Sequence, residues 1–428
     1  MDSKLTITAL AHGGSGVGRI DGKVVFVPFT APGDVAMVEI TADKKAFSEG
    51  ALKEIITPSQ IRATPECSLY GVCGGCSLQH IDYQGQVEWK HRIFEETLRR
   101  IGGISDVEFD AATPSPAPMG YRSRARFHVS GGVWGFFEVK SHKVVGLDAC
   151  PVLDPILNIA FAATRNALKG ADLSIFAVDI GVSEADQKAV ASIHVTSSKG
   201  FPWAEALSGV KELKGYQVLV YPVRQDRNRG RLIERHADTE LFYQVEDMRL
   251  GAGIDVFSQV NRRGNHLLVE KVLSYASLEG TEAVVDLFSG VGNLSLPLAK
   301  RAGSVVGVES AGEAIDAAIK NAHNNNVTNA DFTAMDASAW LKQEIKALEK
   351  KRPDVVVLDP PRGGDTGVAS MLGKVRPARI IYVSCSPPTL ARDLSHLIGT
   401  GYTVKRAGFI DMFPQTFHIE GVVVLEAR

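Results

Sequence analysis

The sequence has no long apolar run. Its strongest apolar segments are about as long as single β-strands, well short of the roughly 20 residues of a membrane-spanning helix. The first ten residues, MDSKLTITAL, also lack the basic start and continuous apolar core of a secretory signal peptide. We therefore expect no contact with a membrane and a cytoplasmic location.

An excess of charge of one sign is also missing. The chain has 47 basic and 49 acidic residues, for a net charge of -2 and a pI near 6.6. This balance excludes bulk electrostatic attraction to nucleic acid, so any RNA contact must be local. The basic residues between positions 90 and 126 could form such a contact or only a solvated helix face. With 428 residues, 45% of them hydrophobic, the chain predicts two or three globular domains.

Cysteine is scarce, with five residues in the chain. Cys67, Cys73 and Cys76 lie within ten residues of one another, and Cys150 stands alone. Close cysteines in a reducing compartment more often bind metal than pair as disulfides, and four thiolates suit zinc or an iron–sulfur cluster. The spacing lacks the repeated two-residue gap of a zinc ribbon, which favours iron–sulfur over zinc. Unrelated buried thiols are the alternative.

Residues 4–60 alternate short β-rich runs with turns, a pattern that predicts a small β-barrel. The glycine cluster at 12–18 precedes a strand and lacks the ending of a phosphate loop, so it is interpreted as a hairpin loop. Residues 86–100 have helical spacing and end at a Gly-Gly pair. Strand-like runs from 121 to about 245 then predict a mostly antiparallel middle domain.

From about residue 251 the pattern changes to strands alternating with helices, as in a doubly wound α/β sheet. A strand at 283–287 runs into a glycine turn, and the next strand ends at Glu309, where an acid can bind ribose hydroxyls. The short glycine loop resembles an S-adenosylmethionine loop more than a dinucleotide loop. Asp336, after the third strand, is placed for the adenine edge.

Two further strands end in polar motifs. Asp354–Gly364 (DVVVLDPPRGG) contains Asp359, and Ile380–Leu394 (IIYVSCSPPTLARDL) contains Cys385 just past its apolar run. Strand ends of one sheet converge on one cleft. A thiol there is a candidate nucleophile, and the chain therefore reads as a cofactor-dependent enzyme that attacks its substrate covalently.

Over essentially its whole length the chain resembles the RNA uracil-5 methyltransferases, in particular the iron–sulfur branch that acts on 23S ribosomal RNA. The matching features are Cys67, Cys73, Cys76 and Cys150, together with FSQVN (257–261), DLFSGVGN (286–293), LDPPRGG (358–364), VSCSPPTLARDL (383–394) and DMFPQTFHIEGVVVLEAR (411–428). Two departures are Ser289, where the family often has cysteine, and Ser386-Pro387-Pro388, where Asn-Pro-Ala is more usual. Neither removes a reacting group.

The resemblance implies a multidomain α/β architecture. A TRAM or OB-like β-barrel would occupy residues 1–62. A central antiparallel α+β domain with an iron–sulfur cluster would occupy residues 63–84 and 113–250. A Rossmann-like methyltransferase domain would occupy residues 85–112 and 251–428. The implied cofactors are S-adenosylmethionine and a 4Fe–4S cluster held by Cys67, Cys73, Cys76 and Cys150, in a protein expected to be a monomer.

The resemblance also implies roles for the site residues. Cys385 would add to carbon 6 of uracil, which activates carbon 5 for methylation, and Glu420 would remove the carbon-5 proton. Phe257 either stacks near the flipped uracil or belongs to the core. The implied S-adenosylmethionine contacts are Gln259, Phe288, Asn293, Glu309, Asp336 and Asp359.

Three other classes of enzyme fit the motifs less well. Amino-group methyltransferases place an aromatic residue after Asp-Pro-Pro, where this chain has Arg362. Cytosine-5 RNA enzymes usually carry a second cysteine in that region, and radical S-adenosylmethionine enzymes space their cysteines differently. Two alternatives stay open: methylation of uracil in the transfer-RNA T loop, and a noncatalytic iron–sulfur RNA-binding factor.

Overall fold

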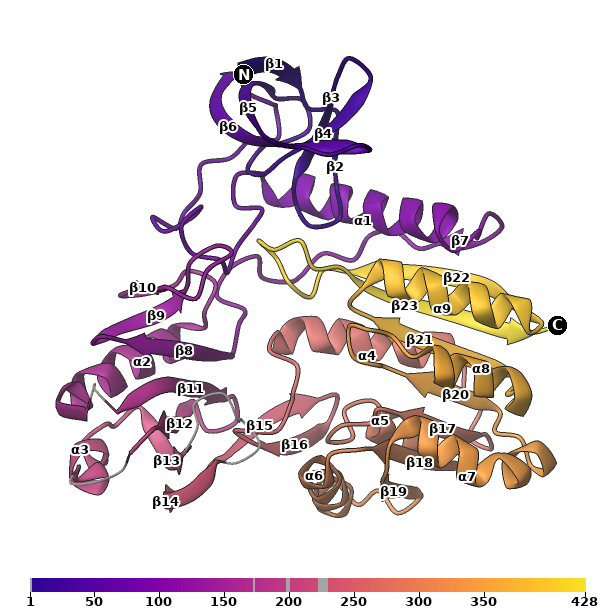
Figure 1. Cartoon of the computed structure of the whole chain (residues 1–428). Coiled ribbons are helices and arrows are strands. Elements are labelled where there is room, and N and C mark those ends of the chain that lie inside the picture. The colour runs from indigo at the N-terminus through magenta and orange to yellow at the C-terminus, as the bar shows by residue number, and fades with distance from the viewer. Residues whose placement is uncertain (1, 172–173, 198–200, 222–229) are drawn as a thin grey trace.

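The computed structural model describes residues 2–171, 174–197, 201–221 and 230–428, whose strands form three large sheets and a two-stranded ribbon (Figure 1). In Figure 1 the N-terminal sheet lies above the other two, which stand side by side. Within the described residues no helix is long and apolar enough to cross a membrane.

The N-terminal sheet has the order β1-β5-β6-β4-β3-β2. Its alternating apolar residues enclose a small core of their own, which includes Leu5, Val25 and Val38. The glycine cluster lies in the hairpin between β2 and β3, as predicted. The strands are β1 (Asp2–Thr6), β2 (Ala9–Leu10), β3 (Gly16–Ile20), β4 (Lys23–Val27), β5 (Val35–Asp43) and β6 (Phe47–Thr57).

The middle sheet has the order β10-β9-β8-β11-β12-β13-β14 and is antiparallel except between β12 and β13. Helices α2 (Pro155–Ala167) and α3 (Trp203–Ser208) pack on it through an apolar core, and neither helix was predicted. A short 3-10 turn, η1, spans Lys169–Ala171. The strands are β8 (Arg124–Ser130), β9 (Val133–Phe137), β10 (Val144–Gly146), β11 (Ile175–Ser183), β12 (Lys188–Val195), β13 (Leu213–Val220) and β14 (Arg231–Ala237).

The C-terminal sheet has the order β19-β18-β17-β20-β21-β23-β22-β7. Its first five strands are parallel, and β23 lies antiparallel between β21 and β22. This is the doubly wound sheet that the alternating pattern predicts, with an antiparallel strand added. The strands are β7 (Glu108–Phe109), β17 (Ala283–Leu287), β18 (Ser304–Glu309), β19 (Ala330–Ala334), β20 (Val355–Leu358), β21 (Arg379–Ser384), β22 (Tyr402–Ile410) and β23 (Glu420–Ala427).

Helices cover both faces of the C-terminal sheet and create two cores. One core receives α4 (Arg262–Ala276), α5 (Ser295–Ala299), α6 (Gly312–Asn324) and the ribbon of β15 (Glu240–Val245) and β16 (Met248–Gly253). The other receives four helices, α1 (Tyr83–Arg100), α7 (Ala337–Lys350), α8 (Thr366–Val375) and α9 (Pro387–Gly399). Burial on both faces explains why the parallel strands read as continuous apolar runs.

Helix α1 and strand β7 join this sheet although they precede the middle sheet in the chain. Asp82 caps α1 by accepting a hydrogen bond from the Gly85 amide (2.7 Å), and α1 packs against α9. Lys90 of α1 is buried and forms an ion pair with the buried Asp411 (2.8 Å between Nζ and Oδ1). These contacts fix the segment after β22, which leads into the site.

Candidate active site and cofactor cleft

The carboxyl ends of the parallel strands lie at one edge of the sheet. Leu287 at the end of β17 pairs with Leu358 at the end of β20, and Leu358 pairs with Tyr382 of β21. The polar residues that follow these strands therefore come together, as the sequence pattern indicates. Because β20 lies between β17 and β21, Asp359 after β20 lies between the glycine loop after β17 and Cys385 after β21.

The antiparallel strand β23 brings Glu420 to the same edge. Ser384, the last residue of β21, pairs with Gly421 of β23, so Cys385 and Glu420 occupy the next positions on neighbouring strands. Glu420 is 3% exposed, and Cys385 is half-buried. A thiol open to the outside thus stands beside a carboxyl group that is almost enclosed, from segments 35 positions apart in the chain.

Burial and neighbouring acids govern the protonation of this site. Burial is the largest cause that raises the pKa of Cys385 to about 11, and the charges of Glu420 and Asp359 raise it further. Arg362 opposes them by hydrogen bonding and by its charge. Burial also raises the pKa of Asp359, and burial together with Asp359 raises that of Glu420 well above its usual range. In the free protein these groups therefore favour their neutral forms.

A cleft beside Asp359 contains four of the six predicted cofactor contacts. Gln259, Phe288, Asn293 and Asp359 line it, and Phe257, whose side chain is 71% exposed, lies at the same cleft. Exposure of so large a ring favours the base-stacking interpretation of Phe257 over the core interpretation. The other lining residues are Tyr243, Ser258, Asp286, Ser289, Gly290, Val291 and Leu294.

The glycine loop needs unusual backbone conformations. Phe288, Gly290 and Gly292 all have positive φ, at 65°, 53° and 87°, which is costly for phenylalanine and easy for glycine. The Gly290 amide donates to the Glu309 carboxylate (3.3 Å), so Glu309 contacts the loop without lining the cleft. A strained residue at a strand end is common where a backbone approaches a ligand.

Asn293 and Asp336 have protein partners of their own. The amide of Asn293 forms two reciprocal hydrogen bonds with that of Asn265 (2.8 and 2.9 Å), which fixes its orientation. Asp336 is exposed, does not line the cleft, and caps α7 by accepting from the Ala339 amide (2.9 Å). Its placement is that of a helix cap next to the third strand.

Sequence reasoning missed Tyr243, Asp286 and Ser289 as cleft residues. Burial raises the pKa of Asp286 to about 7, and its Oδ1 atom and the Ser289 hydroxyl have no hydrogen-bond partner among the described residues. Unpartnered buried polar atoms at a cleft suit a polar ligand. Asp286 opens the DLFSGVGN motif and could have been found there, whereas Tyr243 comes from the separate ribbon and has no local signal.

The four clustered cysteines meet at one cavity. Cys67, Cys73, Cys76 and Cys150 line a cavity of about 420 Å³, and each is half-buried. Burial, followed by the nearby thiols, raises the pKa of Cys76 to about 12, with the same direction for Cys73 and Cys150. A bound metal binds cysteines as thiolates, and its positive charge would offset the repulsion between them. The donor set therefore fits the predicted metal centre.

A second group of possible ligands, Asp179, His194 and Asp255, has a different explanation. Asp179 accepts from Arg126 Nε (2.8 Å) and lies 2.9 Å from His194 Nε2. Its carboxylate is therefore already paired with a cation, and we assign no metal to this group.

Comparison with known proteins identifies the fold. Residues 82–428 match the family model described as tRNA (uracil-5-)-methyltransferase, and residues 4–53 match the TRAM domain. The 23S rRNA (uracil(1939)-C(5))-methyltransferase RlmD of Alcanivorax borkumensis is 32% identical, covering 98% of this chain and 96% of that protein. RlmD of Photobacterium profundum is 34% identical, covering 98% and 93%.

One solved structure is similar over the whole chain. The tRNA (uracil-54, C5)-methyltransferase of Pyrococcus abyssi, in complex with S-adenosyl-L-homocysteine, has a TM-score of 0.80 and 26% identity. The similarity covers 99% of this chain and all of that one. With the matching family model and the relatives above, these comparisons confirm the resemblance. The chain belongs to the family of RNA uracil-5 methyltransferases and is an S-adenosylmethionine-dependent enzyme with an N-terminal TRAM domain.

Proposed function

We propose that this enzyme methylates carbon 5 of one uridine in 23S ribosomal RNA through a covalent adduct with Cys385. The observation that supports it best is the adjacency of Cys385 and Glu420 at the strand ends next to the cofactor cleft. The relatives named for 23S rRNA favour that target. We expect the enzyme to act in the cytoplasm as a monomer.

In the proposed reaction, Cys385 Sγ bonds to carbon 6 of uracil and the ring becomes an enolate. Carbon 5 then takes the methyl group from the sulfonium of S-adenosylmethionine, which leaves as S-adenosylhomocysteine. Glu420 removes the proton from carbon 5, the carbon 6–sulfur bond breaks, and the thiolate returns. Cys385 reacts as the thiolate, so its own proton leaves before the attack, and the proton from carbon 5 passes to Glu420. No step needs an oxidant or a metal.

The buried acids determine the order in which cofactor binding and proton removal occur. In the free protein burial favours the neutral form of Glu420 and raises the pKa of Asp359 to about 7, and a neutral carboxyl group cannot act as a base. S-adenosylmethionine supplies a positive sulfonium as well as the methyl group. Its charge beside Asp359 would favour the carboxylate forms, so Glu420 becomes a base only when the methyl donor is in the cleft.

The cofactor contacts follow from the cleft. We propose that Gln259, Asn293 and Asp359 bind polar groups of S-adenosylmethionine, and that Phe288 packs on it. Glu309 would bind the ribose hydroxyls from beside the glycine loop, as an acid in this position does. Asp336 would reach the adenine edge while capping α7. Phe257 would stack near the flipped uracil.

We also propose a 4Fe–4S cluster on the four cysteines, with a structural or RNA-positioning role, because no step above moves an electron. We propose that the chain divides into three domains. The barrel comprises residues 1–62, and the cluster domain comprises residues 63–84 and 113–250. The catalytic domain comprises 85–112 and 251–428. Iron and sulfide analysis of protein purified without oxygen tests the cluster, and about four irons per chain are expected. Zinc in their place would contradict it, and so would oxidation that stops methyl transfer while RNA binding persists.

The adduct is tested with an RNA that carries 5-fluorouridine at the target, where loss of the carbon-5 proton is blocked. Wild-type enzyme and S-adenosylmethionine should give a complex that survives denaturation, and Cys385→Ala should give none. Glu420→Gln should form the adduct with ordinary RNA and release it slowly. A Cys385→Ala enzyme that retains turnover would rule out the mechanism.

The target is tested by mapping 5-methyluridine in cells without the gene, complemented with wild type or Cys385→Ala. We expect loss at one 23S position that only wild type restores. Loss in transfer RNA would instead support the T-loop alternative, which the Pyrococcus abyssi structure favours. No loss in either RNA would support the noncatalytic binding factor.

A further inference from the structure

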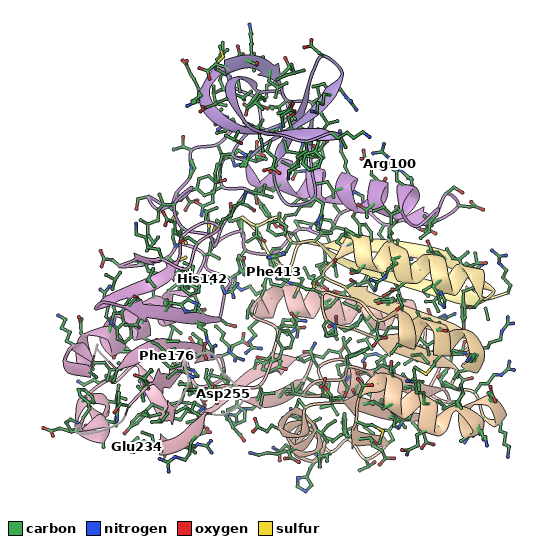
Figure 2. All side chains as sticks on the ribbon, viewed as in Figure 1. Arg100, His142, Phe176, Glu234, Asp255 and Phe413 are labelled. Carbon is green, nitrogen blue, oxygen red and sulfur yellow. The ribbon has the colours of Figure 1, made fainter. Side chains whose placement is uncertain are left out.

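The loop between β22 and β23 joins the TRAM domain to the reacting residues. In Figure 1 it extends from the C-terminal sheet toward the middle sheet, and Figure 2 labels Phe413 in it. His418 lies in this loop, with its ring 4.4 Å from that of Phe417 and 5.7 Å from that of Phe413. The ring of Phe417 also contacts the ring of His12, which lies in the β2–β3 hairpin. The two rings pack edge to face, with 6.0 Å between their centroids.

His418 also contacts the site on its other side. Its Nε2 atom lies 3.3 Å from Nη2 of Arg362, and Arg362 lowers the pKa of the Cys385 thiol by its charge and by hydrogen bonding. Arginine can only donate, so Nε2 of His418 must accept, and the imidazole must be neutral. Burial lowers the pKa of His418 to about 4, and the neighbouring basic groups Arg362, Lys90, His12 and Arg122 lower it further.

Within the part of the chain that the structure describes, Arg362 is the cation that favours the Cys385 thiolate. It is an exposed side chain after β20, with the freedom of a long side chain on a loop. A cation stabilises a thiolate only while it stays close, because the interaction falls with distance and with solvent screening. An anchor for the guanidinium therefore affects the nucleophile directly.

We propose that His418 is a positioning residue of the active site: its neutral imidazole accepts a hydrogen bond from Arg362 and holds the guanidinium against Cys385. The TRAM hairpin supports His418 through Phe417. This inference rests on the proposed function, since it assigns Cys385 as the nucleophile. It adds a link from the RNA-binding TRAM domain to the reacting sulfur.

The test measures the Cys385 thiolate itself. Alkylation of the Cys385 peptide by iodoacetamide is followed by mass spectrometry from pH 7 to 10 in the whole protein, without RNA or S-adenosylmethionine. His418→Leu, which removes the acceptor, should slow alkylation at pH 8 about tenfold, as expected for a pKa rise of one unit. His418→Gln, whose amide oxygen can accept from Arg362, should restore most of the rate.

A double-mutant cycle separates positioning from folding. Arg362→Leu should slow alkylation at least as much as His418→Leu, and the double variant should be no slower than Arg362→Leu alone. Melting temperature and affinity for S-adenosylhomocysteine should stay near wild type in all three. In methyl transfer, kcat should fall in His418→Leu while KM for S-adenosylmethionine is unchanged.

Additive effects of the two substitutions, or an unchanged alkylation profile in His418→Leu, would overturn the proposal. The proposal would also fail if the His418→Gln protein folded normally but did not recover the alkylation rate of Cys385. These outcomes do not depend on whether Cys385 is the nucleophile. If 5-fluorouridine RNA is not trapped while the alkylation results hold, the proposed function fails and the positioning contact remains.

Discussion

At the scale of the residue, the site contains several buried carboxyl groups and too few neighbouring cations to stabilise their ionised forms. Burial raises the pKa of Asp286, Asp359 and Glu420, and the charge of Asp359 raises the pKa of the other two further. Arg362 is the cation that acts on the thiol and on Glu420. A cofactor with a sulfonium and an ammonium group supplies the missing charge, so the free and bound proteins should differ in protonation.

Binding of S-adenosylmethionine should therefore release protons near pH 7. The cationic cofactor lowers carboxyl pKa values that burial has raised, and a group that titrates near neutrality then ionises. Calorimetry in two buffers of different ionisation enthalpy measures the release. S-adenosylhomocysteine, which has no sulfonium charge, is the matched control and should release fewer protons. Equal release by both ligands would contradict the prediction.

The raised pKa of Asp286 predicts how the stability of the folded protein depends on pH. Its pKa is about 7 in the folded protein and 3.8 as a free group, so it stabilises the fold fully below pH 4 and loses that contribution as pH rises to about 7. Asp286→Asn does not titrate. The free variant should gain stability over wild type across this window, by at most about 4 kcal/mol at pH 8.

Thermal unfolding of both free proteins between pH 4 and 8 measures this difference. A gap that is constant with pH would show that Asp286 does not titrate there. In the same variant, the affinity for S-adenosylmethionine should fall, because Asp286 lines the cleft.

At the scale of the element, helix α1 fixes the loop that holds His418. Lys90 is fully buried, pairs with Asp411 and donates to the Phe413 carbonyl (2.9 Å). Loss of one partner leaves a buried charge without compensation, which typically costs about 3–5 kcal/mol. The contact between α1 and this loop is therefore a strong requirement of the fold.

Lys90→Met should lower the urea midpoint of unfolding by an amount that corresponds to about 3–5 kcal/mol. Lys90→Met with Asp411→Leu should recover much of this loss. Arg92→Met is the control on the same helix, since its pair with Glu88 is exposed, and it should change stability by about 0.5 kcal/mol or less. Equal effects of Lys90→Met and Arg92→Met would disprove a special role for the buried pair.

The same elements show which features a sequence can reveal. The doubly wound sheet, the hairpin at the glycine cluster and the family were predicted, because period, turn residues and motifs are local properties. Helix α2 was missed inside a region of strand-like runs, although Asp154 caps it and Pro155 begins it. The position of Tyr243 and the contact of Arg362 with His418 depend on packing between segments far apart, which no local pattern encodes.

At the scale of the whole molecule, the cysteine cavity joins distant segments. Three cysteines belong to the stretch before α1, and Cys150 belongs to the segment between β10 and α2. A metal cluster there would close a loop of the chain and bind only the folded state, so it would stabilise the protein by linkage.

Removal of the proposed cluster should therefore lower the melting temperature by several degrees. The affinity for S-adenosylhomocysteine should change little, because the cofactor cleft has no residue in common with the cysteine cavity. Scanning calorimetry and ligand titration of iron-loaded and iron-free protein measure both. Cys76→Ser purified in the same way should match the iron-free wild type. A large loss of cofactor affinity would show that the two sites are coupled.

The position of β23 has a consequence for biosynthesis. This strand lies inside the sheet, between β21 and β22, yet every other strand of the sheet comes before it in the chain. During translation the gap beside β21 stays open until residues 420–427 have left the ribosome, and Glu420 arrives only with them. A nascent chain in which β23 has not yet paired thus holds the Cys385 thiol without the neighbouring carboxyl group, so it lacks the proposed base.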